Sequence, residues 1–109
     1  MKSPIVVCLK GRKDGTIIQG CDIYIGRRLT MGGWNLEDSI WRNPYKVDRD
    51  GTLDQIMVKY RNHILSNTAL ISKLIDLDGK ILGCWCKGKK DRDKCHGDVL
   101  VELFNYYFM

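Results

Sequence analysis

Three cysteines and one of the two histidines fall within a single stretch near the C-terminus. Cys84 and Cys86 flank a tryptophan, and Cys95 is followed directly by His96 in the run CHGD. Thiolates and imidazole are ligands that tetrahedral zinc accepts, and the charge of the metal offsets the repulsion between buried thiolates. The four residues therefore form a candidate zinc site, although CxC and an adjacent CH are tighter than the usual CxxC spacing.

Two other interpretations of this cluster stay open. A reactive thiol would need a base, and His96 could be that base, with Asp98 orienting the imidazole. The position just ahead of a helix would favour the thiolate. Alternatively, the cysteines are small buried residues, while His96 and Asp98 only cap the helix that follows. The catalytic pair His96 and Asp98 thus competes with a zinc site and with a structural cluster.

A second group of candidates lies in the irregular stretch Gly26–Lys46, which has no sustained helical or strand period. Long loops within a compact domain are uncommon and often bind ligands. Arg27 follows an expected strand end, where α/β sheets bind ligands, and its guanidinium suits phosphate. The candidate ligand-binding residues are Arg27, Trp41, Arg42, Asn43 and Tyr45.

Structural roles compete with ligand binding in this stretch too. Trp34 and Trp41 could stack on a base, or pack the loop onto the core. Asn43 precedes Pro44, which fixes its own φ and keeps Asn43 out of helical geometry. The side chain of Asn43 could therefore cap a turn instead of binding a ligand.

The composition of the chain is that of an ordinary soluble globular protein. Its 109 residues, 44% hydrophobic and 28% charged, predict one domain over residues 1–109. No apolar run reaches membrane-spanning length and no secretory signal is visible, so we expect a cytoplasmic protein (host cytoplasm if viral) without a membrane partner. In that compartment the five cysteines should be thiols or metal ligands.

The charge balance favours an anionic partner. A net charge of +5 suggests a nucleotide or another phosphate compound, or nucleic acid. The basic run Lys87–Lys94 contributes to this excess, either as a solvated loop or as a segment that steers an anion toward the cysteines.

The order of expected elements predicts the fold class. Thr52 and Gln55 form a capping box ahead of an apolar stripe with helical spacing. The expected strands are Pro4–Lys10, Thr16–Gln19 with Cys21–Ile25, and Lys80–Cys86; the expected helices are Leu53–Leu65, Thr68–Asp76 and Val99–Tyr107. Strands separated by helices need a crossover. We therefore expect an α/β fold, a small single-layer sheet with at least one parallel pair, in the order β-(β)-β-loop-α-α-β-α.

Several of these segments together resemble a known family. They are DIYIGR at residues 22–27, WRNPY at 41–45, GT at 51–52, GKILGCWC at 79–86 and CHGDVL at 95–100. In this order they resemble domain of unknown function family 4326, small proteins of bacteriophages and large DNA viruses. The likeness runs from about Cys21 to Phe104. It implies a compact α/β domain without an established activity, and it picks out Arg27, Asn43, Pro44, Cys84, Cys86, Cys95, His96 and Asp98.

The leading hypothesis is a pocket for a nucleotide or related phosphate ligand, between the loop 27–45 and the helix start at residues 95–98. Such a pocket could sequester its ligand or hydrolyse it, so enzymatic activity stays undecided. The alternatives are a zinc-braced nucleic-acid-binding protein and an interaction adaptor without chemistry.

Overall fold

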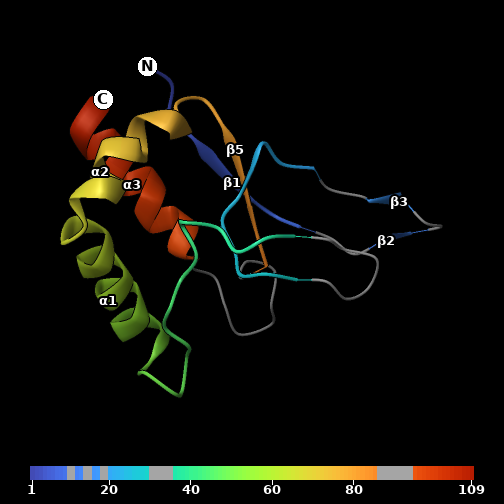
Figure 1. The fold of residues 1–109 in the computed structure, drawn as a ribbon, viewed down its shortest axis with the longest axis horizontal. Helices are drawn as coiled ribbons and strands as arrows, with labels where there is room; N and C mark the ends of the chain where they lie inside the picture. The colour runs from blue at the N-terminus through green and yellow to red at the C-terminus, as the bar shows by residue number, and fades with distance from the viewer. Residues whose placement is uncertain (10–11, 14–15, 18–19, 30–35, 86–94) are drawn as a thin grey trace.

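The structure is a computed structural model, and it describes residues 1–9, 12–13, 16–17, 20–29, 36–85 and 95–109. A three-stranded parallel sheet forms one layer of the fold (Figure 1). Its strands are β1 (Ile5–Cys8), β5 (Ile81–Cys84) and β4 (Ile23–Tyr24), in the spatial order β1-β5-β4. Both pairs are parallel, with Cys8 opposite Cys84 and Tyr24 opposite Gly83. The predicted α/β class and parallel pairing are confirmed.

Helices pack together beside this sheet (Figure 1). They are α1 (Leu53–Leu65), α2 (Thr68–Lys73), the 3₁₀ turn η1 (Leu74–Leu77) and α3 (His96–Phe108). The helix α3 lies against β1 on one side and contacts α1 and η1 on the other. The buried core between these layers includes Ile25, Trp41, Tyr60, Ile64, Leu74, Leu82, Leu100 and Phe104.

The capping box predicted for α1 is present. The hydroxyl of Thr52 accepts the Gln55 N–H at 3.3 Å, and the Gln55 carboxamide oxygen accepts the Thr52 N–H at 2.8 Å. These bonds satisfy backbone donors that a helix start leaves without partners. The predicted bounds Leu53–Leu65 are those of α1.

Two helices have bounds that differ from the prediction, and one observed strand was not predicted. The helix α3 begins at His96 and not at Val99, because Cys95 already acts as its N-cap. The second helix stops at Lys73 and tightens into η1. A short strand that was not predicted, β2 (Arg12–Lys13), pairs antiparallel with β3 (Thr16–Ile17).

No helix within the described parts of the chain is both long and apolar enough to cross a bilayer.

Candidate functional site

The carboxyl ends of the three parallel strands meet at one edge of the sheet. Main-chain hydrogen bonds continue past the strands here, with Leu9 N–H donating to the Cys84 carbonyl (2.8 Å) and Ile25 N–H to the Gly83 carbonyl (2.9 Å). The N-terminus of α3 lies at the same edge, since its first residue His96 contacts Ile25. Ligands of open α/β sheets bind at this edge, which is where the sequence argument expected a site.

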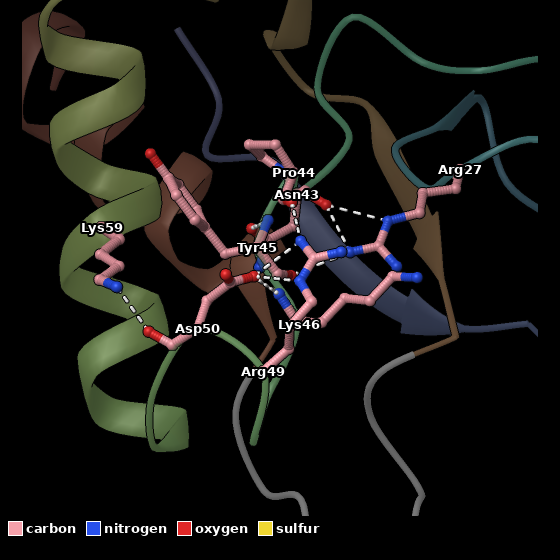
Figure 2. Close-up of polar contacts among 8 residues, drawn as sticks. All are labelled: Arg27, Asn43, Pro44, Tyr45, Lys46, Arg49, Asp50 and Lys59. Atoms are coloured by element: carbon pink, nitrogen blue, oxygen red, sulfur yellow. Dashed lines mark hydrogen bonds and ion pairs between the residues drawn. The ribbon is translucent and has the colours of Figure 1, made fainter.

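Arg27 leaves the sheet just beyond β4 and bridges to the loop 43–45 (Figure 2). Its Nε and Nη2 atoms donate to the Asn43 carbonyl at 3.0 and 2.8 Å, and Nη2 also donates to the Tyr45 carbonyl at 2.9 Å. The planar guanidinium is thus held in one orientation by main-chain acceptors. Carbonyl groups carry no net charge, so the positive charge of Arg27 persists at this edge.

The backbone of Arg27 is held in place by two aromatic residues. The hydroxyl of Tyr24 donates to the Arg27 carbonyl at 2.5 Å and accepts the Trp85 indole N–H at 3.0 Å. A side chain at Gly26 would collide with the Tyr24 ring, so glycine is needed between them. Tyr24 and Trp85 were not among the predicted site residues, because nothing in their spacing signals a contact across 61 positions.

His96 faces inward, toward the sheet. Its side chain is 3% exposed and its Nε2 lies 2.6 Å from the carbonyl oxygen of Ile25. A carbonyl only accepts, so Nε2 carries the proton and Nδ1 faces the Cys95 sulfur at 3.6 Å. Burial lowers the pKa of His96 below its usual value, and the nearby Arg27 charge acts in the same direction. The imidazole is therefore neutral at pH 7.

Two cysteine sulfurs lie beside this imidazole. The Sγ atoms of Cys84, at the end of β5, and Cys95 are 2.7 Å apart, and both residues are fully buried. The Cys95 sulfur also accepts the Gly97 N–H at 3.3 Å, as an N-cap side chain does. The structure therefore brings together three of the four predicted metal ligands, Cys84, Cys95 and His96.

The structure gives Asp98 a capping role. Its carboxylate accepts the Cys95 N–H at 3.0 Å, which completes a capping box around the start of α3. The orientation of the His96 ring is set by the Ile25 carbonyl and the Cys95 sulfur. The charge of Asp98 raises the pKa of that ring, against the larger effect of burial.

The remaining predicted ligand-binding residues differ in accessibility. Trp41 is 3% exposed in the core, which favours its packing role over stacking on a ligand. The Asn43 side chain accepts the Tyr45 N–H at 3.0 Å and so caps its own turn. Arg42 is exposed and donates to the Ser39 carbonyl at 3.1 Å. Tyr45 is half-buried, with the Lys59 ammonium 5.8 Å from its ring centroid.

A basic segment continues from this loop toward α1 (Figure 2). Arg49 donates to the Pro44 carbonyl at 3.0 Å and forms an ion pair with Asp50 at 2.7 Å. Its hydrogen bond, with that of the Lys46 N–H, lowers the pKa of Asp50. A shallow open hollow beside it, at the start of α1, is lined by Asp50, Asp54, Gln55, Val58 and Lys59.

The described residues contain no group of three or more Cys, His, Asp or Glu side chains arranged to hold a metal ion. The fourth predicted ligand, Cys86, lies outside the described residues, as do Trp34 and the basic run 87–94. What the described cluster can offer chemically is a neutral imidazole, a capped helix start and two adjoining thiols.

The sequence of this scaffold matches a family described as Domain of unknown function (DUF4326) over residues 8–106. The chain belongs to this family. A similar protein, the "Uncharacterized protein R718" of Acanthamoeba polyphaga mimivirus, is 40% identical over 108 residues, covering 95% of this chain and 82% of the relative. The DUF4326 match confirms the resemblance seen in the motifs and extends it toward the N-terminus, to include the end of β1. No solved structure matches the chain.

Proposed function

We propose that the protein binds a small phosphate-bearing ligand at the carboxyl edge of its parallel sheet, and that nucleotides are the ligand class. Arg27 would be the residue that contacts phosphate. The observation that carries the proposal is the orientation of its guanidinium, held by the carbonyls of Asn43 and Tyr45 while the residue stays exposed.

The charge of Arg27 supports this role. In the parts of the chain that the structure describes, the ion pairs join Arg49 with Asp50 and Arg61 with Glu102, so no carboxylate within 4 Å neutralises Arg27. A guanidinium without a carboxylate partner favours an anion, and a planar one favours the bidentate geometry of phosphate. Fixing the side chain in advance also reduces the entropy that binding would cost.

The position of the His96 imidazole favours ligand binding over ligand hydrolysis. A general base must reach the ligand with a free nitrogen, but Nε2 of His96 is engaged by Ile25 and Nδ1 faces Cys95 inside the protein. We therefore assign His96, Cys84 and Cys95 a structural role in supporting the segment that carries Arg27. On this account the protein sequesters or presents its ligand without hydrolysing it.

A thermal-shift screen tests the proposal. Pyrophosphate and nucleoside mono-, di- and triphosphates would be compared on the wild type, Arg27→Ala and Arg28→Ala. Arg28 is the matched control, because it is an exposed neighbour whose main-chain N–H, untouched by the substitution, bonds Asp38 at 2.7 Å. We expect a ligand that raises the melting temperature of the wild type and of Arg28→Ala, with the shift lost in Arg27→Ala.

Two results would contradict this function. One is a shift that Arg27→Ala retains in full. The other is stabilisation only by arbitrary single-stranded oligonucleotides, lost steeply with salt, which would indicate a nucleic-acid-binding protein instead. Product analysis of any ligand that binds would show whether it is turned over.

A further inference from the structure

The pair of sulfurs at the carboxyl edge has a geometry that phosphate binding does not use. Cys84 ends β5 and Cys95 caps α3, and their Sγ atoms are 2.7 Å apart. Two thiolates on one tetrahedral zinc ion, each about 2.3 Å from the metal, would stand roughly 3.8 Å apart. The observed spacing is closer to that of a sulfur–sulfur bond, at about 2.05 Å.

Cys95 lies at the start of α3, and its sulfur makes two further polar contacts there. Its sulfur accepts the Gly97 N–H at 3.3 Å at the start of a helix, where negative charge is stabilised. The unprotonated Nδ1 of His96, 3.6 Å away, can accept the thiol proton. Cys84, whose sulfur contacts that of Cys95, comes from the sheet and not from α3. One cysteine is thus placed to react first and the other to follow.

We propose that Cys84 and Cys95 are a redox-active dithiol, which hydrogen peroxide closes to a disulfide and thiol reductants reopen. The Cys95 thiolate attacks one peroxide oxygen, the O–O bond breaks, and a sulfenic acid forms while hydroxide leaves and takes up a proton as water. The Cys84 thiolate then attacks the Cys95 sulfur, breaks the S–O bond and releases hydroxide, which also becomes water. Two thiols lose two electrons in total, and one peroxide is reduced to two waters.

Burial sets the rate and the selectivity of this couple. Both residues are 0% exposed, so peroxide must wait for a local opening and the first step is slow. Once the sulfenic acid forms, the neighbouring sulfur is already in place. Disulfide closure therefore precedes further oxidation of Cys95 to a sulfinic acid.

Closure would change the site described above. The bond would link the end of β5 to the first turn of α3 and remove the S–H that faces Nδ1 of His96. The other nitrogen of the His96 ring, Nε2, lies 2.6 Å from the Ile25 carbonyl oxygen. Oxidation of the two cysteines would therefore affect the position of the strand end that precedes Arg27.

The test counts thiols and maps the linkage. Metal-free protein would be treated with hydrogen peroxide, quenched, unfolded and alkylated, and its peptides analysed by mass spectrometry. We expect the count to fall from the five thiols of the sequence to three. A single peptide pair should be joined through Cys84 and Cys95, and dithiothreitol should restore all five thiols.

Two sets of variants serve as controls. Cys8→Ser and Cys21→Ser remove half-buried thiols of the same sheet region and should still lose two thiols. Burial and the neighbouring Asp22 charge both raise the pKa of Cys21, so its thiol reacts slowly. Cys84→Ala should lose none to a disulfide and should carry a sulfenic or sulfinic acid at Cys95. The wild-type peptide map does not depend on whether that variant folds.

Three outcomes would overturn the proposal. The thiol count could stay at five under conditions that oxidise an unfolded control, or the linkage could join Cys95 to Cys86. The purified protein could also contain one zinc per chain that is lost in both Cys84→Ala and Cys95→Ala, which would make the pair a metal site.

Discussion

The Nε2 atom of His96 lies 2.6 Å from the carbonyl oxygen of Ile25, across 71 positions of the chain. This contact joins the first residue of α3 to the residue that follows β4. The same ring meets Tyr60 of α1 edge-on, with centroids 5.1 Å apart. One imidazole thus connects a strand end and two helices, and the proposed phosphate site depends on their relative positions.

The buried imidazole predicts a specific pH dependence of stability. Burial lowers the pKa of His96 in the folded state, while the unfolded chain keeps a value of about 6.5. The unfolded state therefore binds more protons below that pH, so the stabilising effect is complete above pH 6.5 and is lost as the pH falls. We expect denaturant titrations to show a loss of up to about 1.4 kcal/mol in unfolding free energy between pH 7.5 and pH 5.5.

The variant His96→Gln is the control for this prediction. Its carboxamide nitrogen can still donate to the Ile25 carbonyl but does not titrate, so the fall between pH 7.5 and pH 5.5 should disappear. Asp50 affects a separate range, because its lowered pKa makes its contribution fade only below its usual value of 3.8. A wild type and variant with parallel pH profiles would show that His96 does not control stability in this range.

The close approach of α3 to the sheet predicts a large effect at one glycine. A methyl group on Gly97 would lie 2.8 Å from Ile25 and 2.9 Å from Val6. We expect Gly97→Ala to lower the unfolding free energy by about 1–3 kcal/mol, despite the better helix propensity of alanine. Gly20→Ala is the matched control, since no residue that the structure describes lies within 4 Å of its methyl position and it should change stability little. Equal effects of the two substitutions would argue against the packing described.

The Tyr24 hydroxyl predicts a link between the sheet and the ligand site. Tyr24→Phe removes the bond to the Arg27 carbonyl and the acceptor for the Trp85 indole. We expect a cost of about 1 kcal/mol in stability and a weaker thermal shift from the phosphate ligand. Tyr106→Phe removes a hydroxyl from a residue that is 77% exposed and should leave both properties unchanged. Unaltered ligand binding in Tyr24→Phe would mean that this hydroxyl does not position Arg27.

Local patterns in the sequence predicted the elements that local interactions determine. The apolar period and the capping box of Thr52 and Gln55 gave α1 its observed bounds. The start of α3 was placed three residues too late, because its N-cap is Cys95, a residue type that rarely caps helices. The order of strands and helices was enough to predict at least one parallel strand pair, because strands joined through helices form a crossover connection.

The candidate site was predictable in part, and the limit has a physical origin. The position of Arg27 after a strand indicated the sheet edge at which the structure places it, but its partners are main-chain carbonyls, which no residue pattern reveals. The same holds for His96, whose partner is the carbonyl of Ile25. The proximity of Cys84 to Cys95 was anticipated from their types, whereas a sulfur contact of 2.7 Å depends on the packing of α3 against β5.

The most direct test of the phosphate site is an NMR titration of ¹⁵N-labelled protein with pyrophosphate, at constant ionic strength. The proposed phosphate site predicts saturable shifts of the Arg27 Nε–H signal and of the backbone amides of residues 26–28, Asn43 and Tyr45, all absent in Arg27→Ala. A saturable response that leaves the Arg27 signals unmoved, or no response at millimolar pyrophosphate, would contradict it.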